Sequence, residues 1–378
     1  MKRILSFLLA LAPLSAFAQF NGSGWYRAQS QASQRYLAVV DPKKIYRSGD
    51  NIFLGGLNCL PDFEDGVVCN PATICWFEQK AVSGSIYSIN LIGQGLNFDQ
   101  RINGSASLNI WATANGCWLY GSGSGLTRYI YDPAVSYSPY VPYTRTGRSN
   151  SDLWNMLPVN SSAGQYFGIR PDVQVTADGS YWATLYAGFP FVPTEGMKVY
   201  TVSKVENGYA VIKEITGTAP KETPLLIRCA GSTVAQNIVT LKSYYEQVSG
   251  VGINYLRGNY YCYIDPSRKK EHNVLAYNAT TMRMLGTDGD GRAAFVKSDI
   301  EYVPANKAYL LVNASTPATL KVVTEEEYTA GVETVTIDGA VPAARQGVYS
   351  LDGQRLGDTP DGLPKGIYIV NGKKVVIN

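Results

Sequence analysis

The chain has 378 residues, of which 45% are hydrophobic and 17% charged, and its formal net charge is +3 at pH 7. Lys2 and Arg3 are the only charged residues among the first eighteen, so a chain without them would carry a net charge of +1. A near-neutral surface excludes electrostatic steering toward nucleic acid or an anionic membrane. A chain of this length exceeds what one hydrophobic core usually serves, so two or three domains are expected.

The first residues, MKRILSFLLALAPLSAFAQ, predict a secretory signal peptide over residues 1–18. An apolar run from Ile4 to Leu14 follows Lys2 and Arg3, and Ala16-Phe17-Ala18 forms a small-x-small cleavage site. The run is shorter than the roughly 18 apolar residues that suggest a bilayer span, and no later stretch reaches that length, so no transmembrane segment is expected. We expect cleavage near Ala18 and a protein that is secreted or displayed at the outer surface.

Residues 19–187 predict a Trp/Tyr-rich β domain. The 27 Tyr, 37 Gly and 19 Pro of the chain are typical of many short strands joined by tight turns. A Trp-led strand, a turn and a Tyr-containing strand recur, first at 24–39 and again from Cys75-Trp76-Phe77. The first unit, with Gly24-Trp25-Tyr26-Arg27 and Arg35-Tyr36-Leu37-Ala38-Val39, resembles the units of ricin-type β-trefoils. The pattern fits a β-trefoil-like domain or a β-sandwich, and both stay open.

Residues 129–143 of this domain, YIYDPAVSYSPYVPY, contain five Tyr and three Pro. Because Pro cannot donate to a strand ladder, the stretch predicts an extended loop that presents Tyr rings. Aromatic faces with a polar handle suit a saccharide or an extended peptide, although the rings could instead pack the loop onto the sheet beneath. A binding role predicts exposed, coplanar rings with no buried carboxylate pair nearby. The candidate ligand-binding residues are Trp111, Trp118, Tyr131, Tyr137, Tyr140 and Tyr143.

Six cysteines, an even number in an exported chain, predict a set of disulfides. Four lie in the first half and two in the second, which indicates two bridges and one bridge in separate domains. The pairing is not fixed by the sequence, and Cys229–Cys262 is the first pair expected. The spacing does not match the CxxC pattern of zinc sites, so no metal ligand is predicted. The candidates for disulfides are Cys59, Cys69, Cys75, Cys117, Cys229 and Cys262.

Residues 188–328 predict a second, antiparallel β-sandwich domain. Apolar and polar residues alternate from Val199 to Ile215, and Asn207-Gly208 is a strong hairpin signal. The stretch Asp288-Gly289-Asp290-Gly291 lacks the third ligand and the terminal Glu of an EF-hand loop, so a tight turn is expected there. No cofactor is predicted.

Residues 347–378 predict two small hairpins after a linker at 329–346. Asp352-Gly353 and Asn371-Gly372 are type I′ turn signals between apolar runs, and a unit this small buries little surface. The ending GVYSLDGQRL…LPKGIYIVNGKKVVI is similar to the C-terminal sorting domains of the type IX secretion system. Together with the Gly196-Met197-Lys198-Val199-Tyr200 stretch, it resembles exported multidomain β proteins of the Bacteroidetes. The resemblance implies a handle for the secretion machinery, although the chain ends on Asn378 where such domains often end on a basic residue; a structural cap is the alternative.

The sequence contains few candidate catalytic residues. The single His, His272, lies in a hydrophilic stretch, and no Gly-x-Ser-x-Gly or His-Glu-x-x-His motif accompanies it. Glycoside hydrolysis needs only two carboxylates about 5 to 9.5 Å apart, and no particular pair stands out. We therefore expect an all-β, non-catalytic binding or adhesion protein whose partner is a glycan or a surface protein. The alternatives are a glycan or peptide hydrolase with an unidentified carboxylate pair, and a structural surface component.

Overall fold

The structure is a computed structural model, and it is all-β: 49% of it is strand. The described residues up to Glu325 form one compact unit, and those from Glu326 onward form a second. One α-helix lies in the described part of the chain, α1 (Glu325–Thr329). The structure describes residues 20–39, 57–60, 66–97, 107–123, 126–134, 142–160, 165–260, 275–330, 347–351, 353–360, 362–370 and 373–377.

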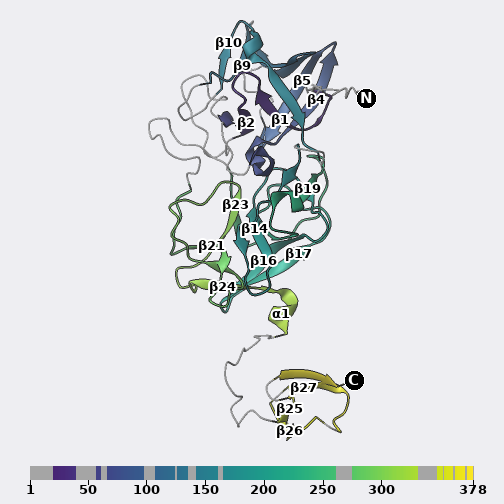
Figure 1. Ribbon diagram of the computed structural model, residues 1–378, viewed down its shortest axis with the longest axis vertical. Helices are drawn as coiled ribbons and strands as arrows, with labels where there is room; N and C mark the ends of the chain where they lie inside the picture. Colours follow the sequence, from purple (N-terminus) through teal and green to yellow (C-terminus); the bar gives the residue numbers. More distant parts are fainter. Residues whose placement is uncertain are drawn as a thin grey trace, which may run out of the picture. The chain divides into compact units, whose positions relative to one another are not determined.

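The first part of the larger unit is a closed barrel of six antiparallel strands (Figure 1). Its neighbours pair in the order β1-β4-β5-β7-β8-β11, and β11 returns to β1 over five residue pairs, from Tyr26↔Pro158 to Ser30↔Trp154. Closure leaves no free strand edge around the barrel. The barrel strands are β1 (Gly24–Ser30), β4 (Cys75–Ser83), β5 (Ile86–Gly93), β7 (Ser107–Thr113), β8 (Gly116–Gly123) and β11 (Trp154–Pro158).

Shorter strands are inserted between barrel strands at three points of the chain. Two of them follow β1, one follows β5 and two follow β8. Each inserted strand pairs with the preceding barrel strand or with its own neighbour. The inserted elements are β2 (Tyr36–Val39), β3 (Leu57–Leu60), η3 (Val67–Cys69), η4 (Pro71–Thr73), β6 (Leu96–Asn97), β9 (Leu126–Tyr131), β10 (Tyr143–Arg145) and η5 (Asn150–Asp152).

The barrel interior is filled by side chains that alternate along the strands, as in other small barrels. Ile110, Leu119 and Ile130 face inward from three successive strands, and Phe77 and Trp154 join them in one apolar cluster. Trp154 is fully buried, and its indole Nε1 donates to the carbonyl of Ile130 at 3.0 Å. The polar end of the largest core side chain is therefore satisfied.

The second part of the larger unit is a curled sheet of ten strands, a half-barrel. The residue pattern predicted an antiparallel sandwich here, whereas the strands form one continuous sheet in which one pair, β17 with β24, is parallel. The predicted hairpin at Asn207-Gly208 is confirmed, because both residues have positive φ and join β16 to β17. In sheet order the strands are β13 (Val173–Gln174), β14 (Tyr181–Leu185), β18 (Leu225–Cys229), β16 (Lys198–Glu206), β17 (Tyr209–Ile215), β24 (Thr319–Thr324), β22 (Ala293–Val296), β21 (Met282–Thr287), β23 (Lys307–Leu311) and β20 (Leu256–Asn259).

A small three-stranded sheet lies beside the curled sheet in the larger unit. Its central strand β19 pairs with β12 on one side and with β15 on the other. The predicted turn at 288–291 is also confirmed, since the Asp288 side chain accepts hydrogen bonds from the backbone N–H groups of Asp290 and Arg292, both at 2.9 Å. The strands of the three-stranded sheet are β12 (Phe167–Gly168), β15 (Phe191–Val192) and β19 (Ile238–Leu241), and the short helical turn η6 (Val234–Gln236) precedes β19.

The barrel and the sheets beyond it share an apolar cluster, which we call the joint. Trp25 and Trp76 of the barrel pack there with Phe189, and Tyr244 lies against the same cluster. The indole Nε1 of Trp25 donates to the carbonyl of Lys242 at 2.6 Å. The joint therefore contains residues from both sides of the domain boundary that was predicted between residues 187 and 188.

The smaller unit contains a four-stranded antiparallel sheet of order β26-β25-β27-β28. It consists of the two predicted hairpins, and β25 pairs with β27 to join them. Val348 is fully buried, whereas Leu351, Leu356, Ile367 and Val376 are at least 40% exposed. The strands are β25 (Val348–Tyr349), β26 (Arg355–Gly357), β27 (Gly366–Val370) and β28 (Lys373–Ile377).

The cysteines differ from the prediction, because the described residues contain no disulfide. Cys59, Cys75, Cys117 and Cys229 are buried thiols. Burial raises the pKa of Cys75 and that of Cys229 to about 12, so both thiols are neutral near pH 7. In the sheet registers these four residues lie opposite Leu37, Tyr26, Ala112 and Tyr181, and never opposite another cysteine.

Several predicted features fall outside the described residues, and their structure is not discussed further. They are the signal peptide at 1–18, Tyr137, Tyr140, Cys262, His272, the Asn371-Gly372 turn, and all of the linker at 329–346 except its first two residues.

Candidate ligand-binding face of the barrel

Aromatic side chains gather on the outer surface of the barrel over β7, β8, β9 and β10. Because Ile110, Leu119 and Ile130 point into the core, the residues on either side of them in each strand point outward. The register then places these outward residues side by side across the strands. We call this surface the outer aromatic face; its members are Trp111, Trp118, Tyr120, Tyr129, Tyr131 and Tyr143.

Trp111 and Trp118 form the first ring pair of the face. They lie directly opposite each other on β7 and β8, with ring centroids 5.4 Å apart and planes inclined by 59°. Both rings are half-exposed. The guanidinium of Arg148 lies over both, 4.3 Å from the centroid of Trp111 and 5.2 Å from that of Trp118, which is the geometry of a cation–π contact.

Tyr131 and Tyr143 form a second ring pair across β9 and β10. Their centroids are 6.3 Å apart with planes at 81°, and Tyr143 is 46% exposed. The Arg145 guanidinium lies 4.5 Å from the centroid of Tyr131. Tyr120 and Tyr129 lie opposite each other on β8 and β9 and form a third ring pair, with centroids 5.5 Å apart, in which Tyr120 is buried. The outer aromatic face therefore carries three ring pairs, two of which have an arginine stacked on them.

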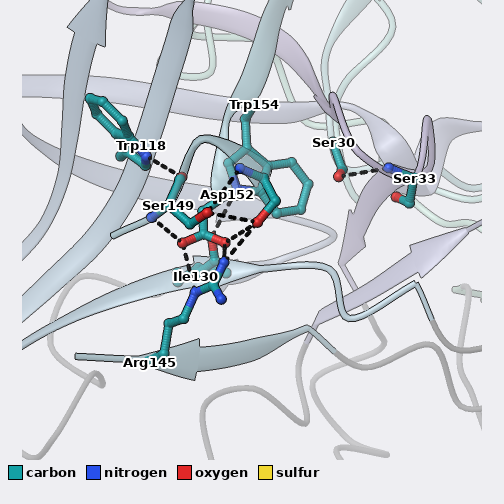
Figure 2. A network of polar contacts seen from close by, with 9 residues as sticks. Ser30, Ser33, Trp118, Ile130, Arg145, Ser149, Asp152 and Trp154 are labelled. Atoms are coloured by element: carbon teal, nitrogen blue, oxygen red, sulfur yellow. Dashed lines mark hydrogen bonds and ion pairs between the residues drawn. The ribbon is translucent and has the colours of Figure 1, made fainter. Parts of the chain in front are cut away.

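A buried carboxylate fixes the segment that carries both arginines. Asp152, in the short turn η5, accepts a hydrogen bond from Arg145 Nε at 2.8 Å and another from the backbone N–H of Ser149 at 2.9 Å (Figure 2). The Ser149 carbonyl in turn accepts the indole N–H of Trp118 at 2.9 Å. The hydrogen bond with Asp152 also raises the pKa of Arg145 above its ordinary value.

The Asp152 network explains why the loop after β10 folds back over Trp118. Ser149 and Asp152 form a capping box, in which each side chain bonds the backbone of the other end of the turn. The side chain of Asp152 is fully buried, and its charge is compensated by Arg145. Residues 145–152 are thus held in one conformation, and Arg148 is held over the two tryptophans.

The structure brings four of the six predicted binding residues together on this face: Trp111, Trp118, Tyr131 and Tyr143. The rings are inclined at 59° and 81°, so the expectation of coplanar rings is wrong. The sequence-based candidates did not include two members of the face, Tyr120 and Tyr129, or the two arginines stacked on it, Arg145 and Arg148.

The buried acids bear on the alternative of a hydrolase, which requires two facing carboxylates. Asp132 and Asp152 are the buried acidic residues in the described part of the chain. Asp132 lies 3.5 Å from a guanidinium nitrogen of Arg35 and accepts a hydrogen bond from the Ser33 hydroxyl at 2.5 Å. Each buried acid is therefore bound to an arginine.

A shallow groove of about 480 Å³ lies elsewhere, on the curled sheet, and shares no residue with the outer aromatic face. It contains a single acid, Glu214, which pairs with Lys198 at 2.9 Å. No group of three or more potential metal ligands occurs among the described residues. In the same residues, no helix is long and apolar enough to span a membrane.

Comparison with known proteins adds nothing to these observations: no family model, no curated protein and no solved structure matches the chain. The outer aromatic face must therefore be interpreted from its own geometry.

Proposed function

We propose that this chain is an exported, non-catalytic binding protein whose β-trefoil-like barrel binds a glycan on its outer aromatic face. The observation that carries the proposal is the arrangement of the Trp111–Trp118 and Tyr131–Tyr143 pairs, each half-open to solvent and each with a stacked arginine. Aromatic faces supply apolar area for the C–H faces of sugar rings, while arginine supplies hydrogen-bond donors for hydroxyl groups.

The order of strands along the chain supports a trefoil-like barrel over a sandwich. Three successive segments, β1 to β4, β5 to β7 and β8 to β11, each begin and end on a barrel strand and carry extra strands between. A β-trefoil repeats such a segment three times around a six-stranded barrel. The Trp-led units of the sequence do not coincide with these segments, because the unit that starts at Cys75-Trp76-Phe77 begins on β4, at the end of the first segment, and continues on β5, at the start of the second.

The sandwich proposed for the second domain finds support in the curl of its sheet. One apolar cluster combines Tyr200 and Val202 of β16 with Phe295 of β22 and Leu310 of β23, which are strands from the other arm of the same sheet. The two arms therefore face each other across a core in the manner of two packed sheets.

We also propose that the smaller unit is a handle for the secretion machinery. Its four short strands leave β26 and β28 as edges, and the opposed pair Ile367 and Val376 exposes apolar surface. Exposed edges and apolar patches mark surfaces that other proteins bind. The same features would serve a structural surface component that binds its own kind, and the two roles differ in whether the isolated chain associates.

A glycan array of the full chain from Gln19 onward tests the proposal. We expect binding that falls at least tenfold in the Trp111→Ala and Tyr143→Ala variants, because each removes one ring pair. Tyr255→Ala is the matched control, since Tyr255 is 42% exposed and lies in the curled-sheet region. Binding that survives both changes would move the site off this face, and an array without any binding would contradict the glycan proposal.

A further inference from the structure

The two arginines of the outer aromatic face differ in their charge balance. Arg145 is neutralised by Asp152, with which it forms an ion pair in addition to its contact with Tyr131. Arg148 is exposed, and in the described part of the chain it has ring contacts and no carboxylate partner. The face therefore presents one uncompensated positive charge, and it lies directly over the Trp111–Trp118 pair.

The position of Arg148 also limits how a sugar can approach. A neutral sugar stacks its C–H face on an indole, but the guanidinium already covers Trp111 at 4.3 Å and Trp118 at 5.2 Å. On the ring faces that Arg148 covers, a neutral sugar would have to displace the guanidinium. An acidic group needs no such displacement, because stacking leaves the N–H donors at the guanidinium edge free to point outward.

Stacking on two rings also prepares the arginine for a planar, two-bond contact. A guanidinium binds a carboxylate or a sulfate through two parallel N–H···O bonds, which are stronger than bonds between neutral groups. Holding the fork on the indoles lowers the side-chain entropy lost when the ligand binds. The loop that carries Arg148 is itself fixed by the capping box of Ser149 and Asp152.

We propose that the Trp111–Trp118–Arg148 cluster binds an acidic saccharide, with Arg148 holding a carboxylate or sulfate group of the sugar. This inference rests on the proposed glycan-binding function and narrows it to anionic ligands. The uronate and the sulfate ester share the chemistry that the cluster recognises, so the test separates them by probe.

The test compares charged polysaccharides with neutral counterparts of the same backbone, by biolayer interferometry on the full chain. Polygalacturonate is paired with its methyl ester, and dextran sulfate with dextran. We expect at least one acidic polymer to bind tenfold more tightly than its neutral counterpart, and less tightly at high salt because an exposed charge is screened. Whichever acidic polymer binds identifies the carboxylate or the sulfate as the recognised group.

Three variants assign the preference to Arg148. Arg148→Gln should reduce binding of the acidic polymer to the level of the neutral one, and Arg148→Lys should retain part of it, since lysine keeps the charge and loses the fork. Arg292→Gln removes the same charge from an exposed site between β21 and β22, and should bind like the wild type. Equal loss in Arg292→Gln, or none in Arg148→Gln, would overturn the inference.

The outcomes also distinguish this inference from the function on which it rests. If neutral polymers bind as well as acidic ones and Trp111→Ala abolishes binding, the glycan site stands and its acidic preference fails. If no polymer of either kind binds, and the glycan array is also without binding, both proposals fail.

Discussion

Two pairs of tryptophans in this molecule have nearly the same geometry but differ in burial. Trp25 and Trp76 face each other across β1 and β4 with centroids 5.2 Å apart and planes at 66°, and Trp111 and Trp118 face each other across β7 and β8 at 5.4 Å and 59°. Both pairs point outward from the barrel. The first is buried and the second is half-exposed.

The two pairs differ in the segments that pack on them. Phe189 and Tyr244 pack on Trp25 in the joint, and Tyr245 packs on Trp76, so that pair becomes part of a core shared with the sheets. Within the described residues, the loop of residues 145–152 reaches the second pair, and it contributes Arg148 rather than an apolar cover. The same local pattern thus builds a joint at one place and the partly exposed outer aromatic face at another.

The largest expected difference between the two pairs is in stability. Trp25→Ala should lower the free energy of unfolding by about 3–5 kcal/mol, because it leaves a cavity in the joint and removes the donor to the Lys242 carbonyl. Trp111→Ala should cost less than about 1.5 kcal/mol, since its ring is already partly solvated. Guanidinium denaturation of both variants measures this, and equal losses would show that the outer pair is also a core element.

A smaller loss of stability is expected when Asp152, which binds Arg145 and Ser149 in the loop of residues 145–152, is replaced. Asp152→Ala should cost about 2–3 kcal/mol, below the 3–5 kcal/mol typical of a fully buried pair, because Arg145 is 38% exposed. Ligand binding should fall as well, since Ser149 and Arg148 lose their fixed position. Asp178→Ala breaks an exposed pair with Arg228 and should cost less than about 1 kcal/mol. If the two variants are equally stable, Asp152 does not organise the loop.

The smallest expected effect is on stability at alkaline pH, and it concerns Tyr245, which packs on Trp76. The Tyr245 hydroxyl donates to Glu78 of β4 at 2.9 Å, and burial, reinforced by that hydrogen bond, raises the pKa of Tyr245 to about 12. A pKa raised from 10.0 on folding stabilises the folded state below pH 10, and this contribution is lost as the pH rises through about 12.

The Tyr245→Phe variant should therefore lose less stability than the wild type between pH 10 and 12. Because Tyr245 is 51% exposed, the difference should stay below about 1 kcal/mol. Tyr255→Phe is the control, because Tyr255 is 42% exposed and its side chain has no hydrogen bond in the described part of the chain; the stability of this variant should change with pH as that of the wild type does. Identical alkaline profiles for all three proteins would show that Tyr245 does not fasten the sheet region to the barrel.

Much of the fold could be predicted from the sequence because strand and turn signals are local. Alternation and the Asn207-Gly208 signal predicted β16 and β17, and the apolar runs near the C-terminus predicted β25 to β28. Closure of the barrel through β11 and β1 could not be predicted, since it joins residues more than a hundred positions apart.

The positions of some residues of the outer aromatic face could be predicted for the same reason. Tyrosine and tryptophan content drew attention to residues 111–143, but composition does not say which rings are covered. Tyr120 and Tyr129 follow from Trp118 and Tyr131 by the period of two along β8 and β9, a signal that was present and not used. Arg148 could not be found this way, because its place over the indoles depends on a loop held by Asp152.

The most direct test of the central claim, that the outer tryptophan pair is the ligand platform, is to map indole oxidation by N-bromosuccinimide with mass spectrometry. The full chain is treated with and without its tightest-binding glycan at saturation. Our account predicts that Trp111 reacts readily in the free protein and is protected by the glycan, whereas Trp25 and Trp76 react slowly in both states. A Trp111 that reacts equally fast with the glycan bound, or is as slow as Trp25 in the free protein, would contradict it.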